Sequence, residues 1–451
     1  MHENANPIVK RIAVKASCAF DSPALIGSGA DEHTDSDVLR RKNGEAFLPG
    51  STIAGVLSSL LSTEEARLLF GQQDDEHNIS PLWVFDTELK DEEGKRAKVI
   101  ELDGVAIDSE NKVAVDKRKY DFEAVQRGTK FTLRFLLVIR KDDDKLRLEN
   151  LLWRLVGALK SGAVAFGAKV RRGFGAVTCS SSVKREFSLT KGNLAALAEW
   201  IAFEWDIEGE SPEAWADADC RAFSGDTAEI LAALSLDGSI MIRDIRNIYN
   251  DLSDNEEVPD YMHISCGKEP VVFGTSWAGA FRSGLYRLLK QKHPEDAAKY
   301  IDDVFGYLIE PKDGGEAKTE PSKVTFAMSF LENVDSRVDG YRQITRVKID
   351  RFTGGAADGA LFSEKPQFGG KTELRIGFPK EREDIRELIM LGLEALDKGL
   401  IQVGGEASIG RGFFSVTGVA VDGVRSSLGS HKEKAKLKAC IDNIGKAGGS
   451  M

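Results

Sequence analysis

One stretch of the sequence combines hydroxyl and glycine residues in a pattern that suits anion binding. In EPVVFGTSWAGAFRSGL, residues 269–285, Thr275 or Ser276 can cap a helix that runs to about Lys290 and leaves N–H groups free at its start. Such a helix start attracts anions. Gly279 lies one turn inside, where glycine costs about 1 kcal/mol relative to alanine, so either a ligand or a packed element should approach its backbone closely.

A second candidate anion site is a loop that mixes glycines with basic residues. The segment FGAKVRRGFGAV, residues 166–177, places Lys169, Arg171 and Arg172 among three glycines, where a phosphate backbone could lie across a bare loop. A tight structural turn explains the same glycines equally well. The loop does not follow GxGxxG, and no GxxxxGK[ST] motif occurs, so the sequence predicts no dinucleotide site and no P-loop.

The composition bounds the class of protein. A chain of 451 residues, with 42% hydrophobic and 29% charged residues, predicts a soluble globular protein of two or three domains. It has no apolar run long enough to cross a membrane, and MHENANPIVKR lacks the apolar core of a signal peptide, so we expect a cytoplasmic protein with no membrane partner. The net charge of -11 argues against a free-standing nucleic-acid binder unless basic residues gather on one face.

The cysteines indicate neither a disulfide framework nor a structural zinc site. They are scattered along the chain without a CxxC pair, which predicts ordinary reduced thiols. The five are Cys18, Cys179, Cys220, Cys266 and Cys440.

The elements that must position these residues occur twice. The segment EAFLPGSTIAGVLSSLL, residues 45–61, aligns with residues 269–285 and places Ser51, Thr52 and Gly55 at a second helix start. In each half there follow a short strand ending in Ile-Asp, a polar excursion, an alternating strand, a helix pattern and a glycine loop. Such a common order predicts a tandem duplication.

We therefore predict two α+β units of alternating strands and amphipathic helices. The first spans residues 1–185 and the second spans 233–423. Residues 186–232 form a linker with one docked helix, and the Lys-, Gly- and Ser-rich tail at 424–451 is flexible.

Taken together, these motifs resemble the RAMP superfamily, which supplies the backbone subunits of type III CRISPR effector complexes. The most specific piece is VKIDRFTGGAADGALF at 347–362, which is similar to an Ile-Asp-Arg-x-Thr-Gly segment of that family. The run from Gly27 to Leu57 resembles the family's Gly-rich turn, Asp-x-x-Val-Ile-Arg and Ile-Pro-Gly-Ser-Ser-x-x-Gly. The likeness covers both units, and two fused units are similar to the type III-D arrangement.

The resemblance implies a ferredoxin-like (RRM-like) core in each unit, with guide crRNA, target RNA and other type III effector subunits as partners. The excursions at 109–127 and 351–368 look like the family's hairpin, which interrupts guide–target pairing and splays one nucleotide. The residues expected to contact RNA are Arg40, Ser51, Thr52, Gly55, Lys169, Arg171, Arg172, Thr275, Ser276, Gly279, Arg282, Arg346, Arg351 and Arg411.

The resemblance also implies a catalytic carboxylate. In active members, an Asp before the Pro-Gly-Ser turn supports cleavage of target RNA with a divalent metal. Counting along the motif puts Asp35 there in the first unit and Asp260 in the second, each as a ligand of Mg²⁺ or Mn²⁺. His33 and His263 lie nearby in sequence and could act as base or acid. Asp-Ser-Asp in a polar loop is also ordinary turn chemistry.

Three functions therefore stay open from the sequence. The first is a guide-directed endoribonuclease, and the second is a scaffold that holds guide and target while other subunits cut. The third is a stand-alone nuclease that processes the guide precursor, which requires a pair of catalytic histidines. The six histidines of the chain form no clear pair of this kind.

Overall fold

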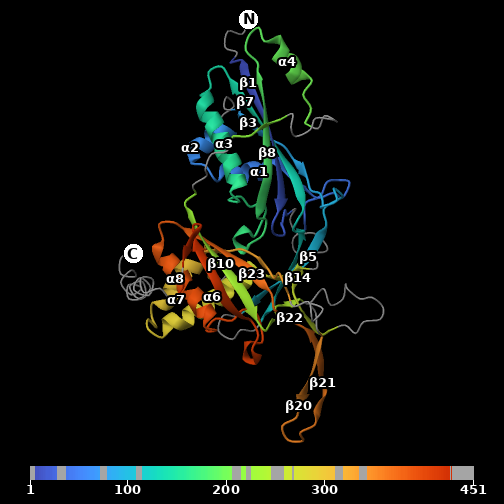
Figure 1. The fold of residues 1–451 in the computed structure, drawn as a ribbon, viewed down its shortest axis with the longest axis vertical. Coiled ribbons are helices and arrows are strands. Elements are labelled where there is room, and N and C mark those ends of the chain that lie inside the picture. The colour runs from blue at the N-terminus through green and yellow to red at the C-terminus, as the bar shows by residue number, and fades with distance from the viewer. Residues whose placement is uncertain are drawn as a thin grey trace. The chain divides into compact units, whose positions relative to one another are not determined.

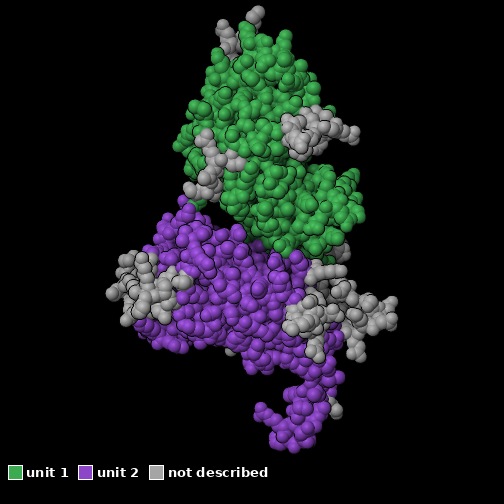
Figure 2. All heavy atoms as spheres, in the orientation of Figure 1, with its two compact units in different colours: residues 1–101, 122–170, 174–225 green, residues 102–121, 171–173, 226–451 purple. Residues whose placement is uncertain are grey.

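The computed structural model describes residues 6–27, 37–71, 79–107, 114–205, 215–219, 225–244, 259–266, 269–309, 318–334, 343–426 and 428. The chain forms two compact units, coloured separately in Figure 2. The first comprises residues 1–101, 122–170 and 174–225, and the second comprises 102–121, 171–173 and 226–451. Both units combine helices with mainly antiparallel sheets, which confirms the mixed α and β composition expected from the sequence.

The first unit is built on a five-stranded antiparallel sheet, and three of its described helices share the apolar core on one face of that sheet. Its elements are β1 (Ile8–Phe20), α1 (Gly50–Ser58), α2 (Thr63–Phe70), β3 (Leu82–Val84), β7 (Lys130–Arg140), α3 (Lys145–Lys160), β8 (Val177–Ser188) and β9 (Ala216–Asp217). The strand order is β3-β7-β1-β8-β9, so the first strand in sequence lies at the centre of the sheet. Apolar residues of α1, α2 and α3 share one buried cluster with those of the sheet.

Helix α3 shows why the sequence folds this way locally. The carboxylate of Asp144 accepts a hydrogen bond from the N–H of Arg147 at 3.1 Å and so caps the helix. Leu148, Leu152 and Leu155 then follow at helical spacing, and all three are buried. The helix therefore has one apolar stripe, which packs against the sheet.

The other face of the first sheet is covered by aromatic residues that follow β8. Helix α4 (Leu194–Ile201) and the residues after it bring Trp200, Phe203 and Trp205 to Phe187 and to Trp215. The ring centroids of Phe187 and Trp200 are 5.3 Å apart. Both faces of the first sheet are thus occupied by this unit's own side chains.

The second unit repeats the first. Its elements are β10 (Thr227–Asp237), α6 (Gly274–Lys290), α7 (Ala297–Phe305), β18 (Thr325–Phe326), β23 (Lys371–Pro379), α8 (Glu383–Asp397), β24 (Phe413–Val421) and β25 (Val424–Ser426). The strand order is β18-β23-β10-β24-β25. Figure 1 shows α6, α7 and α8 together beside this sheet, and their apolar residues share its core.

A shared irregularity supports the duplication. The pairing of β1 with β8 shifts register after Ser17, and the pairing of β10 with β24 shifts after Ala233. In each case the extra residue is a hydroxyl residue on the partner strand. Ser180 donates to the carbonyl oxygen of Ser17, and Thr417 donates to that of Ala233, both at 3.1 Å. The same β-bulge therefore recurs at the same place.

Each half also carries a long hairpin. The first pairs β5 (Val99–Ile107) with β6 (Ala114–Val125), and the second pairs β20 (Ile344–Ile349) with β21 (Ala356–Lys365). The polar segments expected at 109–127 and 351–368 are therefore mostly β-strand where they are described, and the hairpins that contain them begin earlier in the sequence than expected. Figure 1 shows β20 and β21 extending away from the helices of their unit.

Short strands and two 3₁₀ turns complete the described fold. They are β2 (Phe47–Leu48), β4 (Thr87–Glu88), η1 (Val170–Arg172), β11 (Ser239–Ile240), β12 (Arg243–Asp244), β13 (Tyr261–His263), β14 (Ser265–Cys266), β15 (Glu269–Val272), β16 (Tyr307–Ile309), β17 (Lys318–Glu320), β19 (Ser329–Phe330), β22 (Gln367–Phe368) and η4 (Ala407–Ile409). Strand β13 pairs in parallel with β21, which ties the base of the second hairpin to its unit. Within the described ranges, no helix combines the length and apolar character needed to span a bilayer.

Candidate nucleic-acid interface

The helix starts differ from the sequence-based expectation. Helix α1 is preceded by Pro49 and α6 by Phe273, both with extended backbone, and neither helix has a side-chain cap. The prediction that Ser51-Thr52 and Thr275-Ser276 cap these helices is therefore wrong, because the helices begin one residue earlier, at glycine. Their hydroxyl residues lie inside the first turn, where Ser51 and Thr275 are exposed.

Two pairs of equivalent glycines, one pair in each helix position, differ in what lies beside their Cα atoms. A Cβ added at Gly50 would lie 2.5 Å from the carbonyl oxygen of Val84, and one at Gly274 would collide with Phe326. A Cβ added at Gly55 or Gly279 would meet no atom of the described residues within 4 Å. Packing therefore explains the first glycine of each helix, and the packing explanation for Gly279 is wrong. A surface on which glycine is open in both units is compatible with close approach of a ligand.

The electrostatics of the two helix starts differ. The N–H of Gly50 donates to the Asp86 carboxylate at 2.8 Å, so a negative charge already lies at the start of α1. At the equivalent place in the second unit stands Met328, and the first turn of α6 contains no acidic residue. A phosphate is therefore better accommodated at the start of α6 than at that of α1.

The residues of the glycine loop at 166–177 are divided between the two units. Lys169 has φ of 58° and places its ammonium 3.4 Å from the ring centroid of Phe122. Residues 171–173 belong to the second unit, where Arg171 and Arg172 are exposed and the Arg172 carbonyl oxygen would lie 2.6 Å from a Cβ at Gly274. Two predicted RNA-binding arginines thus lie beside the α6 start. We call Arg171, Arg172, Thr275 and Gly279 the α6 surface.

Arg411, in the second glycine loop, does not lie on such a surface. It is 3% exposed, donates to Glu364 at 2.5 Å and forms a short ion pair with Glu406. The expectation that Arg411 contacts RNA is therefore not supported, because its guanidinium is buried between two carboxylates. Arg346 also pairs with Glu364, at 2.7 Å, but keeps 31% of its side chain exposed.

The remaining candidate arginines have diverse surroundings. Arg40 makes two hydrogen bonds to Glu123, at 2.7 and 2.8 Å. Arg282 pairs with Asp302 at 2.6 Å, which fixes α6 to α7. Arg351 is exposed in the turn between β20 and β21. Thr52 and Ser276 are half-buried one residue further into their helices.

The carboxylate of Asp260 is exposed and held at the base of the second hairpin. Its Oδ2 accepts a hydrogen bond from the N–H of Ser363, on β21, at 2.7 Å. The N–H of Asp260 in turn lies 3.3 Å from the Ser363 hydroxyl oxygen and donates to it. This exchange fixes the carboxylate beside the hairpin and leaves its other oxygen without a hydrogen bond from any described residue.

The counterpart of this carboxylate in the first unit follows from the backbone pairing. The N–H of Leu39 donates to the carbonyl oxygen of Ile26 at 2.7 Å, and the N–H of Ile264 donates to the carbonyl oxygen of Ile242 at 2.8 Å. Ile26 and Ile242 follow the central strands of their units, β1 and β10, at equivalent positions, so Leu39 and Ile264 are equivalent as well. Asp35 lies four residues before Leu39, as the second carboxylate does before Ile264. Asp35 and His33 themselves lie outside the described residues.

His263 is not placed to assist at Asp260. The side chain is fully buried, and its Nδ1 accepts a hydrogen bond from the N–H of Ile242 at 3.1 Å. Burial lowers the pKa of His263 to about 3, so the imidazole is neutral near pH 7. The suggestion that it acts as base or acid is therefore not supported, and its role is to hold β13 against the preceding strand.

The described residues include no preformed set of three protein ligands for a metal ion, only carboxylates that stand singly. No group of three His, Cys, Asp or Glu residues in the described part of the chain is close enough to hold a metal ion. Mg²⁺ usually keeps several waters and binds one or two carboxylates together with substrate phosphates. The exposed Asp260, with one carboxylate oxygen open, fits that mode, with RNA supplying further ligands.

The second hairpin carries a feature that sequence analysis missed. Phe352, in the turn between β20 and β21, is 98% exposed. Asp350 accepts hydrogen bonds from the N–H groups of Phe352 and Thr353 at 2.9 and 2.8 Å, and these bonds lower the pKa of its carboxyl. An aromatic residue inside an Asp-x-x-Thr-Gly turn was the signal that could have identified it.

Comparison with known proteins supports the repeat. A family model described as the RAMP superfamily matches residues 18–178 and 258–415, one region in each half and more than half of the chain. No curated protein matches the chain. The two matched regions contain both helix starts, both hairpins and both glycine loops.

Proposed function

Because the chain belongs to the RAMP superfamily, we propose that it is a cytoplasmic, guide-RNA-binding backbone subunit of a type III CRISPR ribonucleoprotein, with two backbone units fused as in type III-D variants. Its partners are the guide crRNA, target RNA and other effector subunits. Each unit corresponds to a ferredoxin-like core with an inserted hairpin. The observation that carries the proposal is the exposed carboxylate of Asp260, held by Ser363 at the base of the hairpin.

Guide binding is assigned first to the α6 surface. It combines the guanidinium groups of Arg171 and Arg172 with the exposed Thr275 and with Gly279, which leaves open space above the helix. Arginine pairs well with phosphate, and a glycine surface lets a nucleic-acid backbone approach closely. An acidic chain can bind RNA this way because only one face has to be basic.

Cleavage of target RNA is assigned to Asp260 and Asp35. RNA carries its own nucleophile: attack of a 2'-hydroxyl on the adjacent phosphorus breaks the bond to the 5'-oxygen and needs a backbone held in line. The hairpin beside Asp260 would splay the nucleotide, and Ser363 would keep the carboxylate oriented. A bound Mg²⁺ or Mn²⁺ would supply positive charge at the scissile phosphate, with Asp260 as its protein ligand.

A scaffold without cleavage remains the second candidate. The hydrogen bonds between Asp260 and Ser363 also join β13 to β21, so they would be useful in a unit that only holds RNA. Under this alternative, the carboxylate stabilises the hairpin base and other subunits cut the target.

The deciding experiment uses the complex reconstituted with guide RNA and an end-labelled complementary RNA, in Mg²⁺ or in EDTA. Asp35→Asn and Asp260→Asn remove charge and keep a hydrogen-bond acceptor, and Asp142→Asn is the control at an exposed carboxylate. The enzyme proposal expects each site variant to lose one specific cut that EDTA also removes. Unchanged cutting by both variants would establish the scaffold.

A further inference from the structure

Two cysteines lie opposite each other in the sheet of the first unit. Cys18 on β1 and Cys179 on β8 are partners in the antiparallel pairing of these strands, and both are free thiols. Opposite residues of an antiparallel pair point to the same face with Cα atoms about 4.5–5.5 Å apart, within the roughly 4.4–6.8 Å that a disulfide spans. Both side chains are buried in the core that the sheet shares with its helices. A bond between the two sulfurs therefore needs little movement of the strands.

The second unit shows that the fold does not require cysteine at these positions. Leu234 on β10 and Val416 on β24 are partners directly after the register shift of that unit. Cys18 and Cys179 are partners directly after the equivalent shift, at Ser17. Cysteine packs as a small apolar residue, so a core of this kind is served equally well by leucine and valine. Two opposed thiols add a chemistry that packing does not need.

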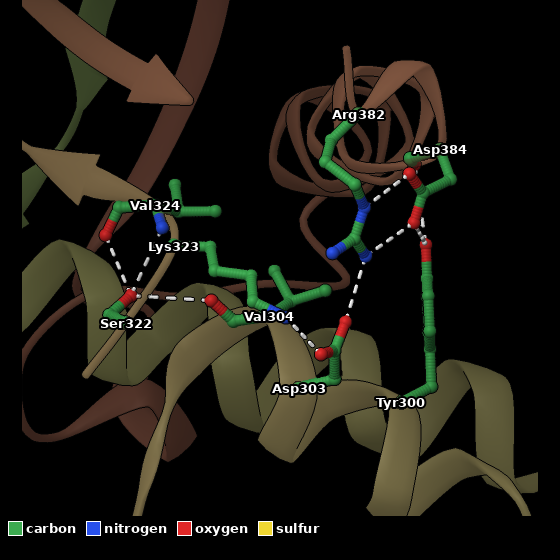
Figure 3. Close-up of polar contacts among 8 residues, drawn as sticks. All are labelled: Tyr300, Asp303, Val304, Ser322, Lys323, Val324, Arg382 and Asp384. Carbon is green, nitrogen blue, oxygen red and sulfur yellow. Dashed lines mark hydrogen bonds and ion pairs between the residues drawn. The ribbon is translucent and has the colours of Figure 1, made fainter. Parts of the chain in front are cut away.

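Other junctions of the described fold rely on bonds that oxidants leave unchanged. Figure 3 shows those between α7 and the start of α8, where Arg382 pairs with Asp303 and with Asp384, both at 2.8 Å. Between α2 and α3 of the first unit, Arg154 pairs with Glu65 at 2.7 Å. The junction of β1 with β8 differs from these ion pairs because it brings two oxidisable side chains together.

The two thiols differ in reactivity. A hydrogen bond with Cys18 lowers the pKa of the Cys179 thiol, and the ammonium group of Lys160, at the end of α3, adds to this effect against that of burial. The same hydrogen bond, together with burial, raises the pKa of the Cys18 thiol. The thiolate is the nucleophile in cysteine oxidation. Cys179, which is 8% exposed, is therefore the sulfur that reacts first, with Cys18 beside it as a thiol.

We propose that Cys18 and Cys179 form a reversible oxidation site at which hydrogen peroxide produces a disulfide. The Cys179 thiolate attacks one peroxide oxygen, the O–O bond breaks, and the hydroxide that leaves takes up the proton that the thiol has lost. The Cys18 sulfur then attacks the sulfur of the sulfenic acid. The S–S bond forms, the S–O bond breaks, and the oxygen leaves as water with the Cys18 proton. Two thiols and one peroxide thus give one disulfide and two waters.

The disulfide would join the central strand of the first sheet to the strand that follows the glycine loop at 166–177. Disulfides in cytoplasmic proteins are usually transient and redox-sensing, so the pair should be reduced at rest and oxidised only after exposure to peroxide. A dithiol reductant reverses the reaction by exchange. The site lies within the first unit and does not depend on RNA binding or cleavage.

The test treats the full, folded chain with a small excess of hydrogen peroxide and blocks the remaining thiols with N-ethylmaleimide. Mass spectrometry of the digest should find the peptides of Cys18 and Cys179 joined, lighter by two hydrogen atoms than the reduced pair, and separated again by dithiothreitol. In urea, where the strands part, the yield of this product should fall about tenfold. Absence of the joined peptides from the folded chain, or an equal yield in urea, would overturn the proposal.

Two variants test the order of the steps. In Cys18→Ala, oxidation should stop at the sulfenic acid of Cys179, which dimedone labels. In Cys179→Val, which copies the second unit, labelling of Cys18 should be about tenfold weaker. Cys266, buried in the second unit, is the internal control and should stay unlabelled in both variants. Equal labelling of the three cysteines would show general oxidation of buried thiols and would also overturn the proposal.

Discussion

Arg411 and Glu364 form a buried ion pair, with 2.5 Å between Nη2 and Oε1, at the position where the first unit places two phenylalanines. Phe174 takes the place of Arg411 between two glycines of the loop, and Phe122 takes that of Glu364 on the hairpin strand. The ring centroids of Phe122 and Phe174 are 5.5 Å apart, in an edge-on arrangement. The same junction between glycine loop and hairpin is therefore apolar in one unit and ionic in the other.

This relationship predicts a rescue by substitution. Arg411→Ala should lower the free energy of unfolding by about 3–5 kcal/mol, because it leaves the buried Glu364 short of a partner. The double change Arg411→Phe with Glu364→Phe copies the first unit and should recover at least half of that loss. Chemical denaturation of the three proteins measures both effects. A double variant less stable than the single one would show that the two junctions are not interchangeable.

The glycines of α6 predict effects of opposite sign on stability and RNA binding. Gly279→Leu should raise the free energy of unfolding by about 0.5–1 kcal/mol, because leucine favours helix and the added side chain meets open space. The same change should weaken RNA binding at least tenfold, because it obstructs the α6 surface. Thermal melting and filter binding with a guide RNA measure the two effects.

The control for this prediction is Gly274→Ala, at a site where a Cβ collides with Phe326. It should lower the melting temperature, in contrast to Gly279→Leu. If Gly279→Leu binds RNA like the wild type, the guide does not cross the α6 surface.

His263 predicts a pH dependence of stability. Its pKa is about 3 in the folded chain and about 6.5 when unfolded, so between these values the unfolded state binds the extra proton. Stability from this group is therefore complete above about pH 6.5 and is lost as the pH falls toward 3, with a slope of up to about 1.4 kcal/mol per pH unit. His263→Gln should be less stable at pH 7 but show a shallower decline in that window.

Denaturation of both proteins at pH 7, 5.5 and 4 provides the measurement. Parallel declines would mean that other groups dominate the acid response. Because the imidazole is buried, the pH profile of target cleavage by the assembled complex should be the same for both proteins.

The sequence was sufficient for the repeat and for the order of its elements, because these depend on local patterns of alternating and helical spacing. It failed at the helix caps, since the extended backbone of Pro49 and Phe273 places the first helical residue at glycine. It also failed at Arg411, whose partner Glu364 lies 47 residues away on another strand. Burial of that kind depends on tertiary pairing, which spacing along the chain does not encode.

The exposed ring of Phe352 predicts a direct role for the hairpin tip in RNA binding. The residue is 98% exposed, and the Asp350 carboxylate holds its turn through two backbone N–H groups, so the ring is presented to solvent on an ordered support. Stacking of a base on an aromatic ring contributes about 1–3 kcal/mol. Phe352→Ser should therefore weaken target RNA binding by the assembled complex about five- to a hundredfold, with an unchanged melting temperature. Leu361→Ser, on the same hairpin and 68% exposed, is the control that should retain affinity. Equal losses for both variants would indicate a general apolar surface and no stacking at the tip.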